Sequence, residues 1–198
     1  MTVNQDKRDR PYPYINKAID LLKSQGMNRV IEIGCVRGPL NHPVHEYHHM
    51  CCNDGHSTAL FAAAGLETIS VDINPVSIEY ANEILSRISS KPYHTYCTDG
   101  IAYLKNYSKS IELLYLDAWD VGTEGSAENH LIAYNTVKNL MVSGSIILID
   151  DTDVDYDGTD LFLADSLPSG KGKLLYPQAI KDGFEEIFRG RQTLLRKP

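Results

Sequence analysis

In this chain of 198 residues, the segment most informative about the fold is Asn28-Arg29-Val30-Ile31-Glu32-Ile33-Gly34. It is a short apolar run that ends in a glycine, which is typical of a buried parallel strand followed by a turn. A helical pattern precedes it, because the apolar residues between Ile15 and Leu22 recur on one helical face. The run therefore predicts the first strand of an α/β sheet.

Strand-like and helix-like segments alternate through the rest of the chain. Further strands are expected at residues 67–71, 93–97, 111–116 and 145–149, with helices at 56–64, 75–88, 100–107, 128–141 and 171–181. Residues 184–188 and 192–195 read as a hairpin. The pattern predicts one α/β domain over residues 1–198, a Rossmann-like, doubly wound, mostly parallel seven-stranded sheet with an antiparallel C-terminal hairpin.

The composition disfavours nucleic acids and membranes as binding partners. The net charge is −7 and no run of Lys or Arg marks a nucleic-acid surface. The apolar runs are too short to cross a bilayer, and the polar first residues lack the core of a signal peptide. We expect a cytoplasmic protein that binds a small molecule, with no nucleic-acid or membrane partner. The sequence leaves a homodimer open.

Each expected parallel strand ends in a polar residue or a glycine. Ligands of open parallel sheets bind beyond the carboxyl ends of the strands, so these residues predict a pocket. Any one of them alone could instead be the N-cap of the following helix. The strand-end residues are Glu32 and Gly34, Asp72, Asp99, Asp117, and the pair Asp150 and Asp151.

Asp72 and Gly34 indicate the kind of ligand. Asp72 ends its strand where a carboxylate can accept hydrogen bonds from both ribose hydroxyls of an adenosine. Gly34 permits close approach of a ligand to the backbone. Neither a Gly-x-Gly-x-x-Gly phosphate loop nor a Walker loop is present. A nucleoside cofactor without a pyrophosphate is therefore favoured over NAD or ATP.

Two motifs carry a family resemblance. Residues 30–34 (VIEIG) resemble the first motif of class I S-adenosylmethionine-dependent methyltransferases, and residues 69–75 (ISVDINP) resemble their ribose-binding strand end. Residues 54–58 look like a turn of the small-molecule O-methyltransferases. The resemblance implies a methyltransferase (EC 2.1.1) with S-adenosylmethionine as cofactor. The implied cofactor contacts are Glu32, Gly34, Gly55, His56, Ser57, Thr58, Asp72, Ile73, Asp99 and Asp117.

A second resemblance concerns a metal ion. Residues 114–120 (LYLDAWD) are similar to the segment of catechol O-methyltransferase that carries a magnesium ligand followed by a tryptophan, and residues 148–151 (LIDD) are similar to its second ligand pair. Macrocin-type sugar O-methyltransferases are metal-dependent relatives. Three clustered carboxylates without a nearby Lys or Arg repel one another, and Mg²⁺ relieves this repulsion. The implied ligands are Asp117, Asp150 and Asp151; the alternative is that these residues only cap loops and helices.

The resemblance implies a mechanism in which the metal lowers the pKa of an acceptor hydroxyl. The expected function is metal-assisted O-methylation of a small molecule such as a sugar, a polyketide or another secondary metabolite. Asp120 replaces the lysine base of the catechol enzymes and is the candidate base, with His130 as a second candidate. The alternatives are a metal-independent N- or C-methyltransferase and a non-catalytic metal-binding protein on the same fold.

A His/Cys-rich insertion is expected at about residues 35–54. It holds four of the seven histidines and three of the four cysteines. Zinc and other transition metals favour such ligands, but the spacing matches no standard zinc finger. We therefore expect a loop that covers the cofactor and shapes the substrate pocket, and keep a zinc site as the alternative.

Overall fold

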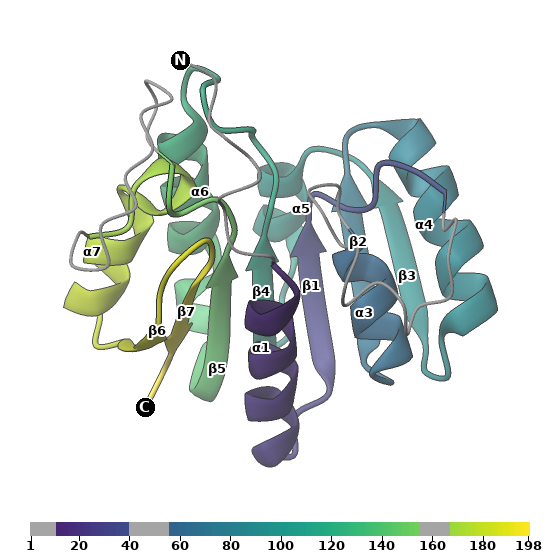
Figure 1. Cartoon of the computed structure of the whole chain (residues 1–198), viewed down its shortest axis with the longest axis horizontal. Helices are drawn as coiled ribbons and strands as arrows, with labels where there is room; N and C mark the ends of the chain where they lie inside the picture. Colours follow the sequence, from purple (N-terminus) through teal and green to yellow (C-terminus); the bar gives the residue numbers. More distant parts are fainter. Residues whose placement is uncertain (1–10, 40–55, 155–166) are drawn as a thin grey trace.

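Seven strands form one sheet at the centre of the computed structural model, which describes residues 11–39, 56–154 and 167–198 (Figure 1). The strand order is β3-β2-β1-β4-β5-β7-β6, and β7 runs in the direction opposite to the other six strands. This confirms the predicted Rossmann-like sheet and its C-terminal hairpin. The strands are β1 (Arg29–Ile33), β2 (Glu67–Asp72), β3 (Tyr93–Cys97), β4 (Ile111–Leu116), β5 (Met141–Ile149), β6 (Glu185–Phe188) and β7 (Thr193–Arg196).

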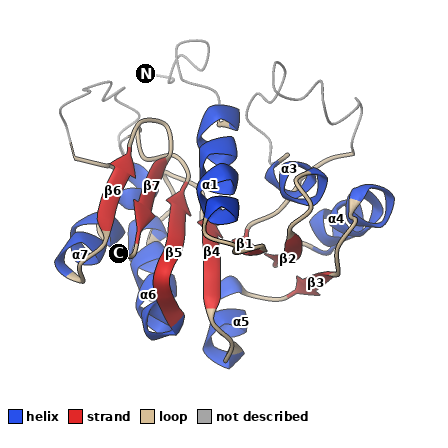
Figure 2. Cartoon of the chain, turned by 90° about the horizontal axis from the view of Figure 1, so that it is seen from below, coloured by secondary structure: helices blue, strands red, loops and turns tan. Residues whose placement is uncertain are grey.

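Helices cover both faces of the sheet, as the two core clusters and Figure 2 show. On one face, α1 (Tyr12–Ser24), α3 (Ser57–Ala63) and α4 (Pro75–Ile88) pack on the strands. On the other lie α5 (Gly100–Asn106), α6 (Ser126–Val137) and α7 (Leu175–Lys181). Strands β1, β4 and β5 lie between these layers, which is why their sequences are nearly continuous apolar runs. Strand β3 lies at the edge and is correspondingly polar.

Two local departures from the predicted elements bear on the site. The segment predicted as one helix over residues 171–181 instead begins with a 3-10 turn, η4 (Gly170–Gly172), and α7 starts only at Leu175. Gly170, at the start of this turn, adopts φ +47°, outside the right-handed helical region. A 3-10 turn, η3 (Lys138–Leu140), also ends α6 early, and β5 begins directly after it.

Within the described ranges, no helix is long and apolar enough to cross a membrane. Most of the predicted His/Cys-rich insertion, residues 40–54, lies outside the described residues, as does Gly55. The zinc alternative and the covering loop both remain predictions.

Candidate cofactor and substrate site

The sheet has its switch point between β1 and β4, where connections leave in opposite directions and ligands of this architecture bind. Gly34 follows β1 there and adopts φ +85°. A Cβ atom at this position would lie 2.5 Å from the carbonyl oxygen of Asp117. Gly34 is therefore required by both its own backbone conformation and the neighbouring strand end.

A cavity of about 480 Å³ opens at this edge of the sheet, within the usual range for small-ligand sites. Its wall is formed by the ends of β1, β2 and β4 and by the start of α5. Six of the predicted site residues line it, namely Gly34, Asp72, Ile73, Asp99, Asp117 and Asp120. The structure thus brings together residues that lie up to 86 positions apart in the sequence.

Asp72 is held in one orientation by two backbone N–H groups. The amide of Asn74 donates to its Oδ1 at 2.8 Å, and the amide of Cys35 donates to its Oδ2 at 3.1 Å. A carboxylate oxygen can accept more than one hydrogen bond, so each oxygen keeps acceptor capacity. The carboxylate is therefore fixed and still able to bind a vicinal diol.

A second wall of the cavity consists of Asp99 and Gly100. Asp99 caps α5 by accepting a hydrogen bond from the amide of Ala102 at 2.8 Å. A Cβ on Gly100 would collide with the side chain of Ile33 and would lie 3.4 Å from the Trp119 ring. The N-cap alternative is therefore true of Asp99, yet the same residue lines the cavity.

Glu32 does not line the cavity. Its carboxylate is fully buried, and it accepts hydrogen bonds from Thr58 at 2.7 Å, from Ser70 at 2.8 Å and from Ser57. The predicted cofactor contacts Glu32, Ser57 and Thr58 instead form a buried cluster that joins β1, β2 and α3. His56 lies at the N-cap of α3 and also does not line the cavity.

Burial raises the pKa of Glu32 to about 7, despite the opposing effect of the three hydroxyl donors. Between pH 4.5 and 7 the folded protein therefore keeps a proton that the unfolded chain has lost, and stability falls as the pH rises. The difference from the ordinary pKa of 4.5 corresponds to on the order of 3 kcal/mol. We expect Glu32→Gln to remove this dependence when urea unfolding is compared at pH 5 and pH 8.

The matched control for Glu32→Gln is Glu79→Gln, since Glu79 is exposed on α4. This control should lose as much stability as the unmodified protein between the two pH values. Equal losses in all three proteins would show that Glu32 is ionised throughout.

Asp120, the first candidate base, lies at the rim of the cavity and is paired with Arg37. The guanidinium donates to its Oδ1 at 2.7 Å and to its Oδ2 at 3.5 Å, and both side chains are at least half exposed. For Asp120 to accept a proton from a substrate, the guanidinium would have to turn away. Its role as a base stays a prediction.

His130, the second candidate base, is in the core. Its side chain is 0% exposed, its Nδ1 lies 2.7 Å from the carbonyl oxygen of Ser126, and its ring packs edge-on against Trp119. Burial lowers the pKa of His130 to about 3. It does not line the cavity, and its role as a base stays a prediction.

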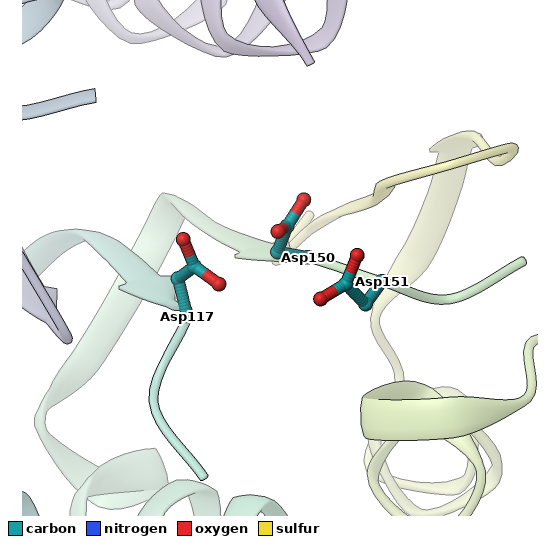
Figure 3. A group of neighbouring side chains, drawn as sticks. All are labelled: Asp117, Asp150 and Asp151. Carbon is teal, nitrogen blue, oxygen red and sulfur yellow. The ribbon is translucent and has the colours of Figure 1, made fainter. Parts of the chain in front are cut away.

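The three predicted metal ligands do lie side by side, as Figure 3 shows for Asp117, Asp150 and Asp151. One oxygen from each lies within 4.8 Å of the others. Asp117 follows β4, and the other two follow the neighbouring strand β5. Asp151 adopts φ +48°, an uncommon conformation for a residue with a side chain.

The expectation that no Lys or Arg lies near this acidic cluster is wrong. The Nζ of Lys171 is 2.6 Å from Asp117 Oδ1 and 3.1 Å from Asp151 Oδ2, and the lysine side chain is 1% exposed. Arg191, also buried, lies 3.8 Å from Asp151 and 3.9 Å from Asp150. The cluster therefore holds three carboxyl groups and two permanent cations.

The pKa values of this cluster follow from burial and charge. Burial, together with the carboxylates of Asp117 and Asp151, raises the pKa of Asp150 well above its ordinary value. Burial opposes the charge of Lys171, but the neighbouring carboxylates outweigh it and raise the pKa of Lys171. The three carboxyl groups and the two cationic side chains therefore share one buried cluster.

A divalent cation does not fit this arrangement while Lys171 is in place. The ammonium group lies between two of the three required ligands, and a metal ion would have to displace it. The third ligand accepts a hydrogen bond at 2.6 Å from Gln192, which is 0% exposed. Repulsion among the carboxylates, which was the physical argument for Mg²⁺, is already relieved by the protein.

Lys171, Arg191 and Gln192 are the site residues that the sequence analysis did not identify. The sequence shows the two glycines that flank Lys171, but the sequence analysis only expected a helix to begin at this lysine. The pair of glycines is the feature in the sequence that could have indicated this site, because both positions require close packing. A Cβ on Gly170 would collide with the Asp151 carbonyl oxygen, and one on Gly172 would lie 2.9 Å from the Thr152 methyl group.

Comparison with known proteins gives the fold. No family model matches the sequence, and no curated protein matches it. Among solved structures, an O-methyltransferase from Bacillus cereus in complex with S-adenosylhomocysteine is similar at a TM-score of 0.60 and 14% identity, over 96% of this chain and 84% of that one. The chain has the fold of these methyltransferases.

Two further structures are similar over most of their length. The N-methyltransferase NodS from Bradyrhizobium japonicum WM9, with bound S-adenosylhomocysteine, has a TM-score of 0.57 and 14% identity over 96% of this chain and 89% of its own. The magnesium protoporphyrin IX methyltransferase ChlM from Synechocystis PCC 6803, with bound S-adenosylmethionine, has a TM-score of 0.57 and 12% identity over 94% and 79%. The fold is thus shared by enzymes with different acceptors.

Proposed function

We propose that the protein is an S-adenosylmethionine-dependent methyltransferase that acts on a small molecule. The observation that carries this proposal is the cavity at the switch point, in which the fixed carboxylate of Asp72 faces the space left by Gly34 and Gly100. The three similar structures, each of a methyltransferase, support it. The sequence contains no Gly-x-Gly-x-x-Gly motif, which disfavours a dinucleotide.

The residues of the cavity fit such a cofactor. Asp72 would accept hydrogen bonds from the two ribose hydroxyls, and Gly100 leaves room for the adenine against Trp119 and beside Asp99. Gly34 and Asp117 would hold the methionine end. S-adenosylmethionine supplies an electrophilic methyl group bound to a sulfonium. The carboxylates of the lining outnumber its single cation, Arg37, and the resulting negative potential suits a positively charged centre.

The chain would contribute to methyl transfer by positioning the cofactor and the acceptor relative to each other. Rigid strand ends hold the cofactor, and an acceptor bound beside Asp117 would be aligned with the methyl group for in-line attack. Asp120 remains the proposed base, because its exposed carboxylate lies at the rim and only Arg37 must move to free it. These roles require no metal ion.

Metal-assisted O-methylation is the less favoured form of this proposal, since Lys171 lies among the expected ligands. Methylation of an oxygen or nitrogen that needs no chelation suits the site better. A non-catalytic metal-binding protein remains a hypothesis that depends on the His/Cys-rich insertion, most of which lies outside the described residues.

A thermal unfolding series tests the choice of cofactor. S-adenosylhomocysteine at about 100 times its Kd should stabilise the folded protein by about 2.7 kcal/mol, which raises the Tm of a domain of this size by roughly 5–10 °C. NAD⁺ and ATP at the same concentration should leave the Tm unchanged. A larger increase with NAD⁺ than with S-adenosylhomocysteine would reject the proposed function.

A further inference from the structure

Lys171 lies where the sequence pattern places a divalent cation. Its ammonium nitrogen bridges Asp117 and Asp151, which come from the ends of two neighbouring strands. We propose that this ammonium group is a permanent internal cation that replaces the metal ion, and that it holds the carboxylate of Asp117 in place at the cofactor cavity. Lys171 itself does not line that cavity, so it is a positioning residue.

The turn that carries Lys171 is built against the end of β5. The amide of Ser169 donates to the carbonyl oxygen of Thr152 at 2.9 Å, and the amide of Lys171 donates to the carbonyl oxygen of Asp151 at 3.4 Å. Gly170 and Gly172 pack so closely on this segment that neither position has room for a Cβ atom. The position of the lysine backbone is therefore fixed, and its side chain is directed into the acidic cluster.

Other oxygens of the cluster also have protein partners. The Tyr115 hydroxyl donates to Asp117 Oδ2 at 3.3 Å, and Gln192 donates both to that hydroxyl and to Asp150. Arg191 lies near Asp150 and Asp151. One oxygen of Asp117 thus accepts a hydrogen bond from the Lys171 ammonium group, and the other accepts one from the buried Tyr115 hydroxyl. Protein donors therefore occupy both oxygens that a metal ion would need as ligands.

This inference deepens the proposed function and rests on it only in the statement that Asp117 faces the cofactor. Its chemical consequence is that the acceptor need not chelate a metal through two vicinal oxygens. A substrate with one isolated nucleophilic oxygen or nitrogen is compatible with the site. Activity in the presence of a strong chelator follows directly.

Manganese binding provides a test that does not depend on catalysis. Free Mn²⁺ is measured by electron paramagnetic resonance during titration of the unmodified protein, Lys171→Ala and Lys173→Ala. Lys173 is exposed two residues away and is the matched control. Removing the buried ammonium leaves a negatively charged cluster with free lone pairs, so Lys171→Ala should bind one Mn²⁺ at least about tenfold more tightly than the other two proteins.

Two results would overturn the inference. One is a single Mn²⁺ bound by the unmodified protein and lost in Asp150→Asn, which would mean that the lysine moves aside for a metal. The other is a folded Lys171→Ala that binds Mn²⁺ no better than Lys173→Ala. If Lys171→Ala does not fold, the titration of the unmodified protein still decides, and no Mn²⁺ bound there supports the internal cation.

Affinity for S-adenosylhomocysteine separates this inference from the proposed function. If the unmodified protein binds S-adenosylhomocysteine equally well in EDTA and in Mg²⁺ and binds no Mn²⁺, both the proposed function and the internal cation are supported. If S-adenosylhomocysteine binds in neither buffer, the methyltransferase proposal is rejected. The Mn²⁺ titration still tests whether Lys171 takes the place of a metal ion.

Discussion

Asp72→Asn is expected to weaken the binding of S-adenosylmethionine by at least about 100-fold, because hydrogen bonds to a charged group contribute roughly 1.5–3 kcal/mol each and two ribose hydroxyls are involved. The structure gives a further reason. Backbone N–H groups donate to both oxygens of Asp72, from Asn74 and from Cys35. An asparagine must turn its own NH₂ group toward one of these donors, so it loses both the charge and the fixed orientation.

Isothermal calorimetry measures this effect, and Asp20→Asn is the control. Asp20 is an exposed carboxylate on α1 and does not line the cavity. Its removal changes the net charge equally and should leave the affinity unchanged. An Asp72→Asn protein that binds as tightly as the control would show that the ribose is held elsewhere.

Gly34→Ala is expected to lower the free energy of unfolding by about 4 kcal/mol or more and to abolish cofactor binding. Two costs add: a side chain at positive φ costs about 1–2 kcal/mol, and overpacking typically costs a further 1–3 kcal/mol. The overpacking here is severe, because the new Cβ would lie 2.5 Å from the Asp117 carbonyl oxygen and 2.6 Å from its carbon. Both atoms belong to backbone that cannot rotate away.

Two other glycines separate these costs in urea unfolding. Gly26 has φ +73° with open space around it, so Gly26→Ala should show the conformational cost alone. Gly38 has open space and no positive φ, so Gly38→Ala should be neutral. A Gly34→Ala protein no less stable than Gly26→Ala would mean that β1 and β4 do not approach each other as described.

The fold could be predicted because its signals are local. Strands β1, β4 and β5 are buried on both faces, so their sequences are apolar runs. Pro75 predicts the start of a helix, and α4 begins at this residue. The strand ends could be predicted for the same reason, since a parallel sheet brings them to one edge. Gly34, Asp72, Asp99 and Asp117 accordingly line one cavity.

The electrostatic partners could not be predicted, because they depend on long-range contacts. Lys171 is 54 positions from Asp117, and only the folded turn shows that its ammonium lies among the carboxylates. Glu32 reads as a strand-end ligand, yet three hydroxyls from distant segments enclose it. The burial of His130 could have been predicted from its spacing, since it shares a helical face with Ala133, Tyr134 and Val137, all of which are buried.

Calorimetric titration with S-adenosylmethionine, carried out once in EDTA and once in Mg²⁺, decides whether the cavity binds this cofactor without a metal ion. We expect one binding site per chain with the same affinity in both buffers, because Asp72 and Gly34 form the site and Lys171 supplies the cation. Absence of binding in both buffers would contradict the claim that this cavity is a methyltransferase cofactor site.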